Sequence, residues 1–180
     1  MGSRDMSIIN TPPNDRIPIQ TEIMAFDEER IAEAIQREIE RGGQIYFVHN
    51  RIEPLINLES TLNNLLPHVR FVTAHGQMPG SKLEKIMMDF MNRKYDCLIS
   101  TMIIESGIDI PSVNTIFVNR ADTLGLGQLY QIRGRVGRSN ERAYAYLLIP
   151  KEKQLTKKSR RRLHAIEEFS DLGSGFNIAM

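Results

Sequence analysis

Four side chains able to bind an anion recur at helical spacing in the C-terminal half of the chain. Gln128, Gln131, Arg135 and Arg138 stand at positions i, i+3, i+7 and i+10, so they share one face of a helix. Guanidinium groups match the geometry of phosphate oxygens and keep their charge at any working pH, and the amides add further hydrogen-bonding groups. We therefore expect this row of side chains to meet a nucleoside triphosphate.

A second stripe on the same expected helix, which spans residues 121–140, is apolar. Leu129, Ile132 and Val136 lie beside the polar row and can anchor the helix to a core. Gly134 and Gly137 each cost about 1 kcal/mol in a helix interior relative to alanine. They are tolerable if another group approaches the backbone closely, or if the helix ends near Gly137.

The elements that must position this helix alternate between short apolar strands and amphipathic helices of about 10–15 residues. That alternation predicts an α/β fold with a mainly parallel central sheet. With 180 residues the chain is long enough for one such domain. We expect a linker over residues 1–16, the α/β domain over 17–150 and a helical extension over 151–180. The strands are expected at residues 17–26, 44–48, 69–74, 96–99, 114–118 and 144–149.

Polar residues follow four of these strands at the point where each ends. They are His49-Asn50-Arg51, His75-Gly76, Ser100-Thr101 and Asn119-Arg120. In a parallel sheet, ligands bind at the carboxyl ends of the strands, so these groups indicate one extended polar ligand surface. The histidines and Arg51 could contact phosphates there, or could simply form pairs at the surface.

The stretch STMIIESGIDIP, residues 100–111, is the second informative segment. Thr101 could donate its hydroxyl to a backbone phosphate, or be an ordinary hydroxyl at a strand end. Gly107 permits a tight or left-handed turn. Asp109 could accept hydrogen bonds from ribose hydroxyls or orient an arginine, and it could equally cap a turn.

Several other classes of site are disfavoured. The acidic run beginning at Asp27 looks superficially like a magnesium box, but these acids suit the start of a helix better. The sequence contains no G-x-x-x-x-G-K-[ST] phosphate loop, so we expect that the chain alone does not cleave ATP efficiently. The sequence also lacks the G-x-G-x-x-G of dinucleotide-binding domains and any zinc-type ligand spacing, and we expect no metal ligands in it.

Composition adds weaker constraints. The net charge of +1 means that any nucleic-acid site must come from local arrangement rather than bulk charge. Cys97 is the single cysteine and lies in an apolar run, which indicates a buried thiol and a reducing, cytoplasmic compartment. No apolar run reaches transmembrane length.

The C-terminal extension combines charge with an apolar stripe. Its stripe, formed by Leu163, Ile166, Phe169 and Leu172, favours packing as the primary role and charge contact as a secondary one. Its basic residues could also track a nucleic-acid backbone. They are Lys151, Lys153, Lys157, Lys158, Arg160, Arg161 and Arg162.

Taken together, these stretches resemble the second RecA-like motor lobe of superfamily 2 helicases and translocases. QIRGRVGR resembles motif VI, STMIIESGIDIP motif V, and the strand exit at residues 48–51 motif IV. The longer string ADTLGLGQLYQIRGRVGRSNERAYAYL and FVTAHGQM narrow the resemblance to the branch that holds RecG and the transcription-repair coupling factors. The segments SIINTPPNDRIPIQT, GRSNERAYAY and AIEEFSDLGSGFNIAM are most similar to the coupling-factor family.

The resemblance implies roles for the matching residues. Arg138 would be an arginine finger with Arg135 as its partner, and Gln131 would help to sense the nucleotide. Gly107 and Asp109 would line the ribose side. The backbone of double-stranded DNA would be held by His49, Asn50, Arg51, His75, Gly76, Ser100 and Thr101.

The resemblance also implies partners and a reaction. ATP with Mg²⁺ would be held mainly by a first RecA-like lobe, which this chain lacks. The whole protein would be a DNA translocase that displaces stalled RNA polymerase and couples transcription to excision repair, contacting the polymerase and repair proteins through other domains. We expect the chain to stop before the end of the TRG (translocation in RecG) motif.

Two alternatives stay open. The chain could be the equivalent lobe of a RecG-type fork-remodelling helicase. It could also be a non-catalytic nucleic-acid-binding module with the same fold. The presence of both Arg135 and Arg138 argues against the second alternative, because simple binding does not require two fingers.

Overall fold

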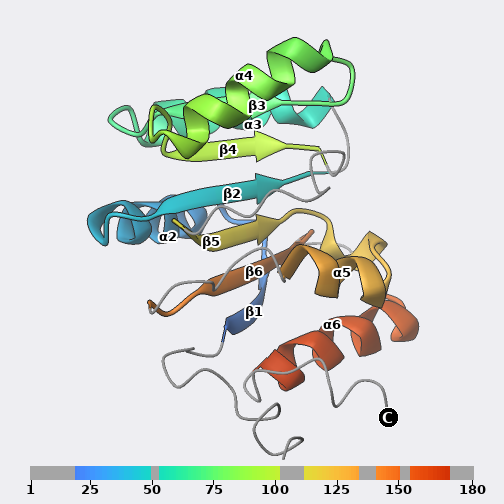
Figure 1. The fold of residues 1–180 in the computed structure, drawn as a ribbon. Coiled ribbons are helices and arrows are strands. Elements are labelled where there is room, and N and C mark those ends of the chain that lie inside the picture. The colour runs from blue at the N-terminus through green and yellow to red at the C-terminus, as the bar shows by residue number, and fades with distance from the viewer. Residues whose placement is uncertain (1–18, 50–52, 102–111, 134–140, 151–154, 171–180) are drawn as a thin grey trace, which may run out of the picture.

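A computed structural model of the chain describes residues 19–49, 53–101, 112–133, 141–150 and 155–170. The strands in these ranges form a six-stranded sheet in the order β1-β6-β5-β2-β4-β3, and all described pairings are parallel (Figure 1). The predicted α/β class is therefore confirmed. The strands are β1 (Gln20–Ala25), β2 (Gln44–Val48), β3 (Phe71–Ala74), β4 (Cys97–Ser100), β5 (Val113–Val118) and β6 (Tyr144–Ile149).

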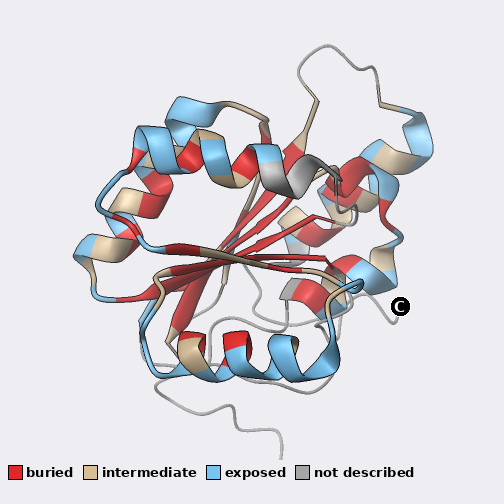
Figure 2. Cartoon of the chain, turned by 90° about the horizontal axis from the view of Figure 1, so that it is seen from above, coloured by how far each residue is buried: buried red, intermediate tan, exposed pale blue. Residues whose placement is uncertain are grey.

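Helices cover both faces of the sheet and make a three-layer arrangement. One apolar cluster lies under α2 (Glu28–Glu40) and α3 (Glu53–Leu65). The other lies under α4 (Gly80–Met91), α5 (Leu126–Arg133) and α6 (Lys157–Ser170). Figure 2 shows the buried residues gathered on the strands and on the inward sides of the helices. No helix in the described ranges is long and apolar enough to cross a membrane.

The start of α2 resolves the two interpretations of the acidic run in favour of helix capping. Asp27 is the N-cap, and its Oδ1 accepts hydrogen bonds from the amides of Glu29 (3.0 Å) and Arg30 (3.3 Å). Glu28 and Glu29 occupy the first turn, where negative charge stabilises the helix dipole. The helix is followed by Gly42, whose φ of 82° lies in the left-handed region that glycine adopts most easily.

A buried carboxylate ties the end of α2 to the sheet. Glu38 is 1% exposed, and it accepts hydrogen bonds from the Arg41 guanidinium (2.6 and 3.1 Å) and from the Thr115 hydroxyl on β5. Gly43 leaves room for this carboxylate, because a Cβ there would lie 2.2 Å from Glu38 Oε2. If Arg41 released Glu38, a buried charge would be left without its ion-pair partner.

This arrangement predicts that Gly43→Ala destabilises the fold by about 1–3 kcal/mol, because the added methyl group displaces the buried Glu38 carboxylate from its bonds to Arg41 and Thr115. Urea unfolding of the chain measures the effect. Gly80→Ala is the matched control, since a Cβ at Gly80 meets nothing within 4 Å, and its stability should be unchanged or slightly raised. Equal stability of the two variants would contradict the packing argument.

The single cysteine lies in the core, as its apolar neighbours predicted. Cys97 begins β4, is completely buried and forms no disulfide. Burial raises the pKa of its thiol well above the ordinary value, so the reactive thiolate is strongly disfavoured.

Candidate functional site

The carboxyl ends of four strands meet along one edge of the sheet. In the order β5-β2-β4-β3, the residues that follow these strands are Asn119, His49, Thr101 and His75. Figure 1 shows the arrows of β2, β4 and β5 pointing to this same side. Three backbone hydrogen bonds extend the ladder past the strand ends: His49 N to Ser100 O (2.8 Å), Thr101 N to Ala74 O (3.2 Å) and Asn119 N to Val48 O (2.9 Å).

The polar side chains at this edge differ in accessibility. His49 and Thr101 are buried, Ser100 is completely buried, His75 is half-buried and Gly76 is exposed. Within the described residues, the hydroxyls of Ser100 and Thr101 are buried without a hydrogen-bond partner. Leaving a buried hydroxyl unpaired costs about 1–3 kcal/mol, so a further polar partner at this edge would be stabilising. Residue type alone did not predict their burial.

His75 is held in one tautomer when its ring is neutral. Its Nδ1 accepts a hydrogen bond from the backbone amide of Gln77 (3.2 Å), so the proton of the neutral imidazole must sit on Nε2. Nε2–H is a suitable donor to an oxygen of a phosphate group. The turn that follows β3 therefore fixes the chemistry of His75 as well as its position.

The anchored helix expected beside this edge is present, but it starts later than predicted. Residues 121–123 form a separate 3-10 turn, η2 (Ala121–Thr123), and α5 begins only at Leu126. Leu124 between them is extended, with φ −98° and ψ 147°, which no continuous helix allows. The prediction of one helix from Ala121 was therefore wrong at its N-terminal end.

The two faces of α5 match the predicted stripes as far as the helix is described. Leu129 and Ile132 are buried in the core, whereas Gln128 and Gln131 are exposed. Gln128 has a local role, because its Oε1 accepts a hydrogen bond from the Gly125 amide (3.1 Å) and so caps the start of the helix. Gln131 lies one turn further along α5, and its side-chain amide is exposed.

A contact that sequence reasoning missed joins α6 to the start of α5. Arg162 donates from Nη2 to the carbonyl of Asp122 (3.0 Å) and from Nε to that of Leu124 (2.9 Å). Ser159 Oγ also donates to Asp122 O (3.0 Å). Arg162 lies three residues after Ser159 and four before the buried Ile166, and this spacing is the signal that separates it from the outward-facing basic residues.

An ion pair beside η2 was also missed. Arg120 has a φ of 52°, unusual for a residue other than glycine, and its guanidinium pairs with the carboxylate of Asp122 at 3.2 and 3.3 Å. Asp122 is buried, so the pair holds a charge where little water reaches. A left-handed arginine cannot be foreseen from its residue type.

The remaining predicted site residues lie outside the described ranges. These residues are Asn50, Arg51, Gly107, Asp109, Arg135 and Arg138. The linker over residues 1–16 and the end of the extension, residues 171–180, lie outside them as well. Among the described residues, no group of three or more His, Cys, Asp or Glu side chains could hold a metal ion.

The parallel sheet, its polar carboxyl edge and the anchored helix beside it define a RecA-like helicase C-terminal domain. Residues 28–140 match the family described as the helicase conserved C-terminal domain, and the chain belongs to this family. It is 56% identical to a transcription-repair-coupling factor of Myxococcus xanthus over 178 residues, covering 99% of this chain and 15% of that protein. The corresponding protein of Bacillus subtilis (strain 168) is 49% identical over 180 residues. The resemblance to the coupling-factor family is thereby confirmed.

Solved structures agree with this fold. RecG bound to a three-way DNA junction matches 93% of this chain and 22% of that chain, with 30% identity and a TM-score of 0.77. Yeast (S. cerevisiae) Dbp5 L327V bound to RNA and ADP BeF3 matches 94% of this chain and 46% of that chain at 16% identity, with a TM-score of 0.62, which supports the fold alone. The chain spans about 15% of the length of the curated relatives it matches.

Proposed function

We propose that this chain is the second motor lobe of an ATP-dependent double-stranded DNA translocase that displaces stalled RNA polymerase and couples transcription to nucleotide excision repair. The observation that carries the proposal is the 56% identity to a transcription-repair-coupling factor over 99% of the chain. The first RecA-like lobe would belong to the same protein. RNA polymerase and the repair proteins would be bound through other domains, in the cytoplasm.

In this proposal ATP is a substrate shared between two lobes. The first lobe holds most of ATP and its Mg²⁺, since the sequence of this chain contains no phosphate loop. Arg138 and Arg135 reach the γ-phosphate as fingers, Gln131 senses the nucleotide, and Gly107 and Asp109 line the ribose side. The exposed amide of Gln131 on an anchored helix fits one side of such a site.

The carboxyl edge of the sheet serves as the DNA grip. The proposed backbone contacts are His49, Asn50, Arg51, His75, Gly76, Ser100 and Thr101. Support comes from the two buried hydroxyls at this edge and from the fixed tautomer of His75. Because Ser100 and Thr101 are buried here, the proposal requires that this edge opens when DNA is engaged.

The chemistry of phosphoryl transfer explains why a motor would divide its site in this way. Catalysis of that reaction is almost entirely positioning and charge stabilisation, so placing the fingers on one lobe and the Mg²⁺ on the other makes hydrolysis depend on closure. Closure moves the DNA grip of one lobe relative to that of the other. Residues 17–150 would form the lobe, and residues 151–180 the extension toward the TRG motif.

A RecG-type fork-remodelling lobe is the second candidate, favoured by the match to RecG with a TM-score of 0.77. Both candidates translocate on duplex DNA, so the motor part of the proposal is common to them. Displacement of a stalled RNA polymerase by the whole protein supports the first candidate. Fork regression without polymerase displacement supports the second.

Thr101→Ala in the whole protein tests the DNA grip. Losing a hydrogen bond to a charged phosphate costs about 1.5–3 kcal/mol, so the DNA concentration that half-saturates ATPase stimulation should rise by about 10–100-fold. The basal ATPase rate without DNA should stay within about twofold, because the hydroxyl does not touch the nucleotide. Steady-state phosphate release with and without duplex DNA measures both.

Two variants control for packing. Thr101→Ser keeps the hydroxyl and should keep most of the stimulation. Thr21→Ala removes another buried hydroxyl that has no partner within the described residues, but on the edge strand β1, and should leave DNA stimulation unchanged. Equal losses of basal and stimulated rates in Thr101→Ala would argue against a DNA role for this edge.

A further inference from the structure

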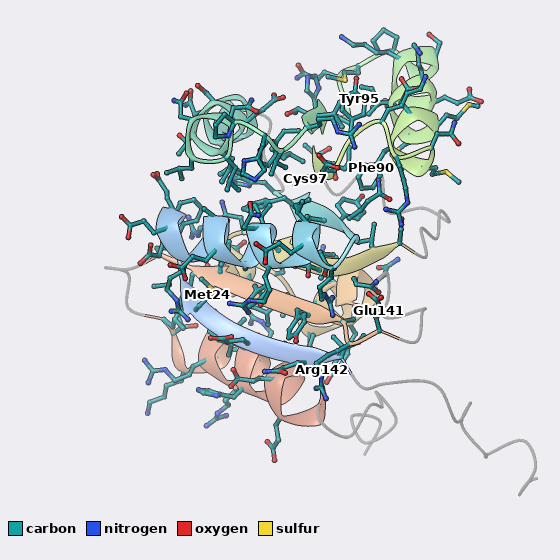
Figure 3. All side chains as sticks on the ribbon, turned by 90° about the vertical axis from the view of Figure 1, so that its left-hand side faces the viewer. Met24, Phe90, Tyr95, Cys97, Glu141 and Arg142 are labelled. Atoms are coloured by element: carbon teal, nitrogen blue, oxygen red, sulfur yellow. The ribbon has the colours of Figure 1, made fainter. Side chains whose placement is uncertain are left out.

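The exposed side of α6 carries a concentrated positive charge. Among its side chains, Lys157, Lys158, Arg160, Arg161 and His164 are exposed, and we call these five the α6 basic face. Within the described residues, no ion pair engages the two lysines, Arg160 or Arg161, whereas His164 lies 3.8 Å from Glu167. Figure 3 shows nitrogen-tipped side chains of α6 extending away from the sheet.

This placement works against the stability of the helix itself. The first turn of α6 contains no acidic residue, although the positive end of a helix dipole favours acids there. Lys157 lies three and four residues before Arg160 and Arg161, so like charges are neighbours on the helix surface. In the same molecule α2 begins with Glu28 and Glu29, whereas α4 and α5, like α6, have no acidic residue in the first turn. The distinguishing feature of α6 is therefore the crowding of like charges, a repulsion that a bound polyanion would relieve.

Contacts on the inner side of α6 hold the α6 basic face close to the candidate site. Leu163 and Ile166 are buried, and Ser159 and Arg162 bind the carbonyls of η2, which follows the carboxyl end of β5. The basic half of α6 therefore lies beside the β5 end of the polar edge, on the side of the sheet that holds β6 and β1. His75 marks the other end of that edge, after β3.

The α6 basic face borders a shallow, open depression. Its volume is about 360 Å³. Four of the six described lining residues are basic and none is aromatic, which suits a polyanion such as a phosphate backbone. A single carboxylate, that of Glu168, also lines it. The described lining consists of Lys157, Arg160, Arg161, His164, Ala165 and Glu168.

We infer that the α6 basic face is a second contact for the phosphate backbone of duplex DNA, separate from the contacts at the ends of the strands. The inference rests on the proposed function, because it assumes that DNA runs along the carboxyl edge of the sheet. It gives the extension a direct role in holding DNA. The strand-end contacts and the α6 basic face would grip the duplex at opposite ends of that edge.

The test compares two double variants of the 180-residue chain that lose the same net charge. Arg160→Ala with Arg161→Ala removes two charges from the α6 basic face. Lys85→Ala with Lys94→Ala removes the charges of two other lysines. Their Nζ atoms lie 3.2 and 3.4 Å from the carboxylate oxygens of Asp89 in α4. Fluorescence anisotropy measures binding of a labelled 30-base-pair duplex at several salt concentrations.

The α6 variant should bind about tenfold more weakly near 0.1 M salt, and the slope of log K against log salt should shrink by roughly 1.8, about 0.9 for each lost phosphate contact. The α4 variant should keep the slope of the unaltered chain. Thermal unfolding of the α6 variant should be unchanged or occur at higher temperature, because alanine favours helix and repulsion is removed.

Three outcomes would overturn the inference, and they are distinguishable. If the two variants have the same slope while the unaltered chain binds duplex, the α6 basic face makes no DNA contact and the proposed function stands. If the unaltered chain does not bind duplex at all, the proposed DNA grip fails with the inference. If the α6 variant loses binding to a polyglutamate peptide but keeps binding to duplex, the partner is an acidic protein segment.

Discussion

Replacement of Arg138 by alanine in the whole protein is expected to lower kcat for ATP hydrolysis by about 10³–10⁵, the contribution of an arginine finger. The proposed reason is that this guanidinium stabilises charge that develops on the γ-phosphate only in the transition state. The affinity for ATP should therefore change little. Steady-state phosphate release and equilibrium binding of a fluorescent nucleotide measure the two effects separately.

Two controls make this result specific. Arg138→Lys keeps the charge but loses the planar fork, so it should recover only part of the rate. Arg142→Ala removes an exposed arginine just before β6, at the opposite edge of the sheet (Figure 3), and should hydrolyse ATP at the normal rate. Turnover close to normal in Arg138→Ala would remove the finger assignment.

The second prediction with a large expected effect concerns ATP hydrolysis by the isolated chain. We expect the isolated 180-residue chain to release no phosphate from ATP above background, with or without duplex DNA. The sequence holds no G-x-x-x-x-G-K-[ST] loop, so in the proposed function the backbone amides and the lysine that cradle the β- and γ-phosphates would come from another lobe. Adding a separately purified first lobe should restore some hydrolysis.

Hydrolysis measured with the isolated chain would count against the two-lobe division only if it did not come from a contaminating ATPase. The Arg138→Ala form of the same fragment, purified in parallel, reports any contaminating ATPase. Robust hydrolysis that disappears in this variant would mean that the chain contains a complete site, contrary to the division into two lobes.

Sequence alone was sufficient for the elements whose signals are local. The runs at residues 44–48 and 144–149 are bounded by turn-forming or polar residues, and β2 and β6 occupy these same ranges. Asp27 caps α2 because its short side chain suits that position in any context. The meeting of the strand exits at one edge followed from parallel topology, which the alternation of strands and helices already implied.

Features that depend on distant partners were missed. Arg162 belongs to the basic tail by composition, but its bonds to η2 arise only because the chain returns there about forty residues later. The burial of Ser100 and Thr101 goes with their place at the end of β4, which lies between β2 and β3, and their residue types do not encode this place. One local feature was missed as well: Leu124 is extended, and α5 starts after it at a cap made by Gln128.

The structure describes six of the proposed site residues. Gln131, His49, His75, Gly76, Ser100 and Thr101 have defined positions, and the last five lie along one edge of the sheet. Their assigned roles remain proposals, as do those of the two fingers. What the fold contributes is the anchoring of α5 on one side by the core and at its start by α6.

The central claim is that this chain is half of a motor that moves along double-stranded DNA. The most direct measurement is displacement of a labelled third strand from a duplex by the whole protein supplied with ATP and Mg²⁺. We predict that displacement occurs and that Arg138→Ala abolishes it while DNA binding persists. A whole protein that hydrolyses ATP on duplex DNA yet never displaces the third strand would contradict the claim.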